Sequence, residues 1–178
     1  FMQENDIITV DLQGHQVCGP GEPTSELLLH LEVYQRRPEV RAVIHAHPPI
    51  ATAFTIAGLS LAEGVLPEVV LSLGAIPTAP YATTGTPAMA AAVRELVPYY
   101  DAILLEQHGA LTLGGSLWEA YNRMDKVEHA AWTVFLARQL GQARGLPPSE
   151  VARLTALGIR KGFRPPRAAQ LLGEGDTS

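Results

Sequence analysis

The segment Ala42-Val43-Ile44-His45-Ala46-His47-Pro48-Pro49 combines a short strand pattern with two histidines and an abrupt stop. Its β-branched residues favour a strand, and the proline pair ends it because proline cannot donate to a strand ladder. Side chains alternate along a strand, so His45 and His47 are expected on one face. Two imidazoles on one face of a rigid strand form half of a divalent metal site; the alternative is two polar residues at a strand end.

The size and charge of the chain narrow the class of protein. Its 178 residues are enough for one domain with a hydrophobic core and few for two. With 13 basic and 18 acidic residues the net charge is −5, and no basic run could follow a phosphate backbone, so we expect no nucleic-acid partner. The single cysteine, Cys18, excludes an intrachain disulfide and suits a reducing compartment. Because no leader pattern or apolar run of about 18 residues stands out, we expect a cytoplasmic protein with no membrane partner.

Patterns typical of strands and helices alternate along the chain. We expect strands over residues 6–12, 15–18, 42–47, 76–81, 102–107 and 110–113, the first two joined in a hairpin. Helices are expected over 26–37, 50–57, 87–97, 117–140 and 148–157, while 67–71 is compatible with a short helix or a loop. Residues 143–178 are rich in Pro, Gly and Arg and are expected to form a C-terminal extension or tail.

The helix expected at 117–140 is the longest. Ser116 and Glu119 form a capping box at its start. We expect His129 to belong to its packing or its rim. The apolar residues that we place on its inner face are Tyr121, Met124, Val127, Ala131 and Phe135.

The helix at 26–37 begins with residues that suit both a cap and a site. Thr24 or Ser25 can cap it. Glu26 lies in the first turn, where the helix dipole favours a carboxylate, so it is either a first-turn acid or a metal ligand. His30, one turn later on the same face, is more simply a packed or hydrogen-bonding histidine than a ligand.

A third histidine follows the apolar strand at 102–107. His108 stands beside Gly109, between two apolar strands, where active-site groups are often presented. Together His45, His47, His108 and Glu26 match a catalytic divalent site, because three protein nitrogens leave one or two positions open for substrate. Zinc is the simplest ion for this ligand set, and manganese, cobalt or iron could be held by the same residues.

Other folds that carry a His-x-His motif fit this chain less well. A metal-dependent hydrolase barrel needs about 250 residues. The two-metal β-lactamase-like pattern needs an aspartate-histidine pair shortly after His-x-His, and here Pro48 and Pro49 follow. A cupin barrel consists mostly of strands, whereas this chain alternates helices and strands.

Several segments occur together, in order, over roughly residues 6–140, and by them the chain resembles the class II aldolase/adducin family. They are Ser25-Glu26-x-x-x-His30, Ala42-Val43-Ile44-His45-Ala46-His47, Gly74-Ala75-Ile76-Pro77-x-Ala79-Pro80-Tyr81, Gly85-Thr86 and Ile103-Leu104-Leu105-x-x-His108-Gly109. A lone His-x-His is a weak signal, but this ordered set is strong. The resemblance implies an α/β fold with three α/β/α layers, in which helices cover both faces of a central, mainly antiparallel sheet over 1–178 as a single domain.

The resemblance also implies roles for residues. By it His45, His47 and His108 are metal ligands, and Glu26 both binds the metal and acts as the catalytic base. Thr24 and Ser25 match positions that help hold a substrate phosphate. The implied reaction is retro-aldol cleavage of a sugar phosphate, such as L-fuculose 1-phosphate, through a metal-stabilised enediolate. The implied assembly is a ring-shaped homotetramer with sites at subunit contacts.

The sequence departs from the family pattern at two places, and these departures leave several reactions possible. The family aldolases use a tyrosine from a neighbouring subunit where this chain has Leu66, and the epimerases use an aspartate where it has Val70. Glu68, between them, is the candidate catalytic acid, or else a surface glutamate. The early phosphate-binding loops also have no counterpart, so either an N-terminal segment is missing or the substrate carries no phosphate. A decarboxylase, a dehydratase, a pentulose-phosphate 4-epimerase and a non-catalytic adducin-like interaction domain stay open as alternatives.

Overall fold

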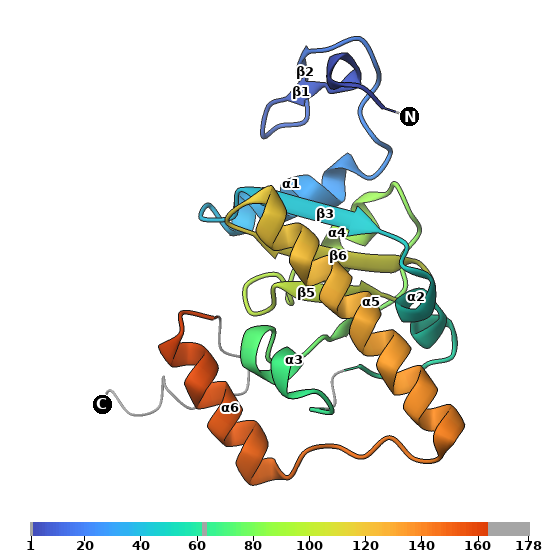
Figure 1. Ribbon diagram of the computed structural model, residues 1–178. Helices are drawn as coiled ribbons and strands as arrows, with labels where there is room; N and C mark the ends of the chain where they lie inside the picture. The colour runs from blue at the N-terminus through green and yellow to red at the C-terminus, as the bar shows by residue number, and fades with distance from the viewer. Residues whose placement is uncertain (1, 62–63, 164–178) are drawn as a thin grey trace.

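A four-stranded mixed sheet forms the centre of the computed structural model, which describes residues 2–61 and 64–163 (Figure 1). Its strands lie in the order β3 (Ala42–Ala46), β6 (Gly109–Gly114), β5 (Ala102–Leu105) and β4 (Thr78–Ala79). β6 pairs antiparallel with both β3 and β5, and only the short β4 runs parallel to its neighbour. The sheet is therefore mainly antiparallel, as expected.

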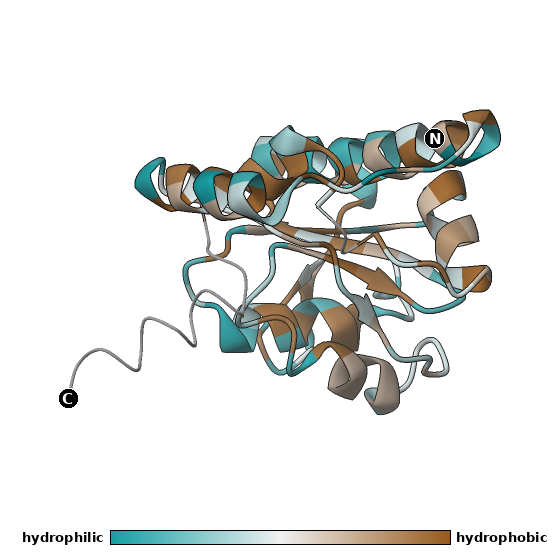
Figure 2. Cartoon of the chain, turned by 90° about the horizontal axis from the view of Figure 1, so that it is seen from below, coloured by the Kyte–Doolittle hydropathy of each residue, from teal (hydrophilic) through white to brown (hydrophobic). Residues whose placement is uncertain are grey.

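Helices cover both faces of this sheet. Helices α1 (Leu27–Arg36) and α4 (Pro87–Val93) pack on one face, while α2 (Pro49–Ile56), α3 (Pro67–Ser72) and α5 (Leu117–Leu140) share a core with the other. Alternate residues of β5 divide between the two cores: Ile103 and Leu105 face α1 and α4, and Ala102 and Leu104 face α5. Figure 2 shows the sheet between two helical layers, with much of its strands coloured as hydrophobic. The three-layer α/β/α prediction is confirmed.

The N-terminal residues form a separate hairpin beside α1 (Figure 1). A short 3₁₀ turn, Glu4–Asp6, precedes β1 (Thr9–Val10) and β2 (Gln16–Cys18), which pair antiparallel. The Gln35 amide of α1 donates to the Leu12 carbonyl at 2.8 Å, which fastens the hairpin to the helix. The predicted hairpin is present, with shorter strands than expected.

The long helix α5 has the predicted bounds and buries most of the predicted inner face, but not its two aromatic residues. Its buried residues include Met124, Val127 and Ala131, whereas Tyr121 and Phe135 are 53% and 38% exposed. Small alanines at neighbouring positions pack on the sheet instead, because they let the helix approach its strands closely. The inward placement of the two aromatic residues was wrong.

Between α5 and residue 163, the end of the described residues, lies one further helix, α6 (Pro148–Arg160), which runs longer than predicted and packs on α3. A Cβ on Gly158 would lie 2.2 Å from the Leu71 carbonyl oxygen, so the two helices are in backbone contact there. This part of the predicted C-terminal extension is folded onto the molecule, and residues 164–178 lie outside the described residues. Among the described helices, none has the length and hydrophobicity needed to span a bilayer.

Candidate metal centre

The end of strand β3 presents the first two histidines. His45 lies opposite Leu111 in the ladder with β6, and its Nδ1 is 3.0 Å from the Ala110 carbonyl oxygen. A carbonyl can only accept, so Nδ1 carries a proton, and Nε2 is the ring nitrogen left to bind a cation. His47 follows just past the strand, exposed, with its Nε2 3.2 Å from the Nε2 of His45. Both imidazoles lie on one side of the strand, as expected.

The turn between β5 and β6 presents the third histidine. Gln107 has a φ of 54°, in the left-handed region, and the His108 amide donates to the Leu105 carbonyl at 3.1 Å. This tight turn directs His108 back toward the end of β3, and its ring centroid lies 4.7 Å from those of both His45 and His47. Histidines more than 60 positions apart in the chain thus converge.

The carboxylate of Glu26 completes the cluster. Glu26 occupies the N-cap position of α1, but its side chain makes no cap hydrogen bond and instead reaches the Nε2 atoms of His45 and His108, at 3.2 Å for His108. The Glu26 side chain is 12% exposed. The helix was expected to start at Glu26 and starts one residue later, at Leu27.

The four side chains together fit a divalent cation. One ligand atom from each of Glu26, His45, His47 and His108 lies within 4.8 Å of the other three. Nitrogens that face one another with unshared pairs repel unless a cation or a proton lies between them. Three imidazoles and one carboxylate are also the donor types that zinc and similar ions take in catalytic sites. The donor set therefore suits such an ion.

Burial lowers the pKa of two histidines in this region, His108 and His30. It lowers the pKa of His108, the neighbouring rings of His45 and His47 lower it further, and the Glu26 carboxylate opposes them. Burial also lowers the pKa of His30, one turn beyond Glu26, with a smaller effect of His45 in the same direction. Neutral imidazole is the form that binds metal, so this environment favours ligation.

Thr24 and Ser25 lie beside the cluster and are exposed. The Thr24 hydroxyl accepts from the Glu26 amide at 3.3 Å, and a Cβ on Gly85 would lie 3.3 Å from the Ser25 carbonyl oxygen. Neither residue belongs to the cluster of possible ligands.

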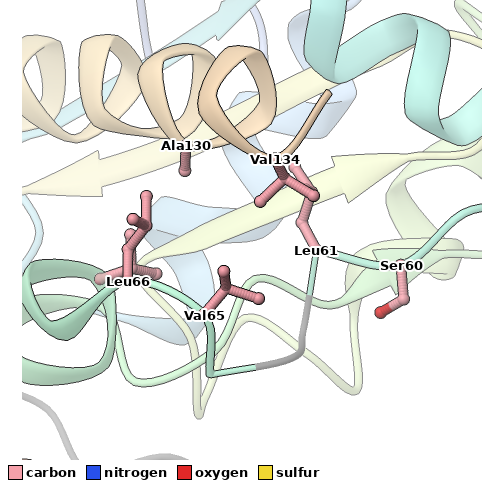
Figure 3. Close-up of a pocket in the computed structure, with 7 residues that line it drawn as sticks. Ser60, Leu61, Val65, Leu66, Ala130 and Val134 are labelled. Atoms are coloured by element: carbon pink, nitrogen blue, oxygen red, sulfur yellow. The ribbon is translucent and has the colours of Figure 1, made fainter. Parts of the chain in front are cut away.

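The residues singled out around 66–70 lie apart from the four-residue cluster. Glu68 is exposed on α3, where its charge interacts with Lys126 of α5. Val70 is 2% exposed in the core. Leu66 lines a small apolar pocket with Leu61, Val65, Ala130 and Val134 between α5 and the segment before α3 (Figure 3). Within one chain these residues do not reach the cluster, so the role of Glu68 stays a prediction.

His129 is exposed on α5.

Sequence reasoning missed the residues that hold the cluster in place. The Ala110 carbonyl, which orients His45, follows from the β3–β6 register, and no sequence pattern specifies that register. Thr55 and Glu128, whose bonds are described below, contact the segments next to His47 and His108. One sequence signal could have indicated Glu128. The Pro48-Pro49 pair leaves the start of α2 without a local cap, so the helix needs an acceptor from elsewhere.

Comparisons with known proteins agree with this geometry. The model of the family described as "Class II Aldolase and Adducin N-terminal domain" matches residues 1–134. The chain belongs to the class II aldolase family. An L-fuculose phosphate aldolase of Methanococcus vannielii is 38% identical to it over 131 residues, covering 74% of this chain and 70% of that protein.

Two further relatives of this class II aldolase show the range of the family. A 3-oxo-tetronate 4-phosphate decarboxylase of Escherichia coli is 34% identical over 139 residues, covering 75% of this chain and 64% of that protein. A solved structure of an L-fuculose 1-phosphate aldolase superposes with a TM-score of 0.81 at 30% identity, covering 91% of this chain and 74% of that one. Together, the family match, these relatives and the four-residue cluster identify this chain as a metal-dependent lyase. The alternative of a non-catalytic interaction domain is set aside.

Proposed function

We propose that this class II aldolase cleaves a sugar phosphate, such as L-fuculose 1-phosphate, by a retro-aldol reaction, with one zinc ion held by His45, His47, His108 and Glu26. The observation that carries the proposal is the convergence of these four side chains, with all ligand atoms within 4.8 Å. The fuculose phosphate aldolases among the relatives support the substrate class. The exposed thiol of Cys18 suits the cytoplasm, where we place the enzyme.

The residues of the cluster have different roles in the proposed reaction. A bound divalent ion supplies Lewis-acid polarisation of the substrate carbonyl. His45 is held in the tautomer that binds metal by its bond to the Ala110 carbonyl. The largely buried Glu26 carboxylate lies between two ring nitrogens, where it moves a proton to and from the substrate carbon at which the carbon–carbon bond breaks.

Two residues beside the cluster supply candidate substrate contacts. The exposed hydroxyl groups of Thr24 and Ser25 lie next to Glu26, and we assign them to the substrate phosphate. The proton of the substrate hydroxyl needs a second acid–base group. We assign this role to Glu68 of a neighbouring subunit, because its carboxylate is exposed and lies outside the cluster of its own chain.

That assignment requires an oligomer, and we propose a homotetramer. The outer side of α5 supports it, because Trp118 stacks on Tyr121 and Trp132 on Phe135, and Leu140 is 91% exposed. Large apolar residues gathered on one helix mark interaction surfaces more often than solvated ones. Light scattering after size-exclusion chromatography should give four times the chain mass; a monomer at working concentration would contradict the assembly.

A substrate screen tests the reaction. Purified zinc-loaded protein is incubated with phosphorylated ketoses, and dihydroxyacetone phosphate is measured with a coupled dehydrogenase. We expect turnover that His47→Ala abolishes and that His129→Ala, which removes an exposed histidine outside the cluster, leaves intact. Failure with every ketose phosphate by a protein that holds its ion would exclude the aldolase assignment.

Decarboxylation is the second candidate. The E. coli relative named as a 3-oxo-tetronate 4-phosphate decarboxylase supports it, as does Leu66, which packs in an apolar pocket where the family aldolases are expected to carry a tyrosine. Carbon dioxide release from a phosphorylated 3-oxo acid, without cleavage of any ketose phosphate, would select this reaction.

A further inference from the structure

Helix α2 starts two residues after His47 and has no local cap. Pro48, at the N-cap position, has no side-chain acceptor, and Pro49 has no N–H, so Ile50 and Ala51 carry the first free amide groups of the helix. Ala51 is fully buried, where an amide without a partner is costly. These amides need an acceptor from elsewhere in the chain.

The acceptor comes from α5. One carboxylate oxygen of Glu128 accepts from the Ile50 amide at 3.0 Å, and the other accepts from the Ala51 amide at 2.9 Å. A carboxylate at a helix N-terminus also interacts favourably with the helix dipole. Glu128 therefore fastens the segment that leaves His47 to the longest helix of the fold.

The other end of α2 is fastened to the turn that carries His108. The Thr55 hydroxyl, 3% exposed, donates to the Thr52 carbonyl at 2.8 Å and accepts from the Gln107 amide at 3.1 Å. Gln107 precedes His108 and has a left-handed backbone φ of 54°, a conformation that residues other than glycine rarely adopt. The hydroxyl group thus holds a strained residue next to a proposed ligand.

We propose that Glu128 and Thr55 are positioning residues for the proposed metal site: through the two ends of α2 they hold His47 and His108 at the separation that a shared ion requires. Neither side chain belongs to the cluster of possible ligands. The inference rests on the proposed function, because it presupposes that the cluster binds a divalent ion. Partners outside the ligand set that orient the ligands commonly change metal affinity by about 10–100-fold.

Helix α2 offers a matched control for Thr55. The Thr52 hydroxyl lies one turn earlier and is buried without a hydrogen-bond partner among the described residues. Thr52→Val and Thr55→Val therefore make the same chemical change on one helix, and only Thr55→Val removes an acceptor of the Gln107 amide. Thr55→Ser keeps that acceptor and tests for rescue.

The test measures the zinc dissociation constant by chelator competition and the absorption spectrum of the cobalt-substituted protein. We expect Thr55→Val to raise the dissociation constant about tenfold and to change the cobalt spectrum. Thr55→Ser and Thr52→Val should stay within about twofold of the wild type. Equal weakening by Thr52→Val and Thr55→Val would mean that general destabilisation explains the effect, and would overturn the positioning role.

Glu128→Gln is a second, independent variant, should Thr55→Val not fold. It replaces one accepting oxygen with an NH₂ group that faces a backbone amide, and we expect about tenfold weaker zinc binding. Asp125→Asn is the control, because it also removes one negative charge from α5, at an exposed residue. It should leave zinc binding unchanged. Wild-type protein that binds no ion would overturn the proposed function together with this inference. A wild type that binds one ion, with unchanged affinity in both Thr55→Val and Glu128→Gln, would overturn the positioning role alone.

Discussion

A Cβ placed on Gly109 would lie 2.4 Å from the carbonyl oxygen of Ala46. It would also lie 2.6 Å from Cδ2 of His47. Strand β6 therefore approaches the end of β3 more closely than any side chain allows, at the point where two of the proposed ligands meet. The glycine after His108 is a packing requirement of the cluster.

Gly109→Ala should lower both stability and metal affinity. The new methyl group must push apart backbone that is fixed on both sides, and we expect a loss of about 1–3 kcal/mol in the free energy of unfolding. Urea denaturation and zinc titration measure the two effects. Gly115→Ala is the control, because its Cβ would meet only the flexible Glu119 carboxylate at 3.3 Å. Equal behaviour of the two variants would disprove the packing argument.

Asp101 joins the buried Arg37 and the partly buried Arg123 at the end of the sheet away from the cluster. It accepts from Arg37 at 2.7 Å and from Arg123 at 3.0 Å, and the Arg37 side chain is 8% exposed. Asp101→Ala removes the buried carboxylate and leaves Arg37 with only the exposed Glu39 and Arg123 with only Glu119, so we expect a loss of up to about 3–5 kcal/mol in unfolding free energy. Glu39→Gln, at the exposed partner of Arg37, should cost less than about 1 kcal/mol. A small effect of Asp101→Ala would show that water replaces the carboxylate.

The metal-free protein should lose stability as the pH falls below the ordinary histidine pKa of 6.5. Burial lowers the pKa of His30 in the folded state, so the unfolded state binds more protons between the two pKa values. The contribution of His30 is complete above pH 6.5 and declines below it. His108 acts in the same direction. Unfolding free energies at pH 7.5 and 5.5 measure the decline, and His30→Gln should reduce it; the same slope in the variant would contradict this assignment.

Glu26→Gln should separate catalysis from metal binding. The three proposed imidazole ligands remain, so most of the metal should stay bound, while the loss of the carboxylate that we propose to transfer the proton should lower kcat by orders of magnitude. Steady-state kinetics and metal analysis of the same preparation give both quantities. A variant that keeps wild-type kcat would remove Glu26 from the proposed mechanism.

Much of the fold could be predicted from local signals. Prolines and β-branched residues mark the limits of β3, and the Ser116 cap places the start of α5 where the structure has it. The inward stripe of α5 was harder, because periodicity alone did not distinguish Tyr121 from Ala120. The choice depends on how closely the helix approaches the sheet, which is a tertiary property.

The site was predictable to a different extent. The common face of His45 and His47 follows from strand geometry alone, whereas the approach of His108 and Glu26 was predicted with the help of a family resemblance. The anchoring of α2 could not be predicted, because Glu128 lies 78 residues from the amide that it accepts from. No periodicity or spacing rule connects positions so far apart.

The number of divalent ions bound per chain shows whether the four side chains form one metal site. Protein equilibrated with zinc and freed of excess ion is analysed by inductively coupled plasma mass spectrometry, beside His108→Ala and the His129→Ala control. We predict about one ion per chain for the wild type and for His129→Ala, and almost none for His108→Ala, because His108 is one of the three proposed imidazole ligands. A wild type without a stoichiometric ion, or a His108→Ala variant that binds zinc as tightly as the wild type, would contradict the proposed metal site.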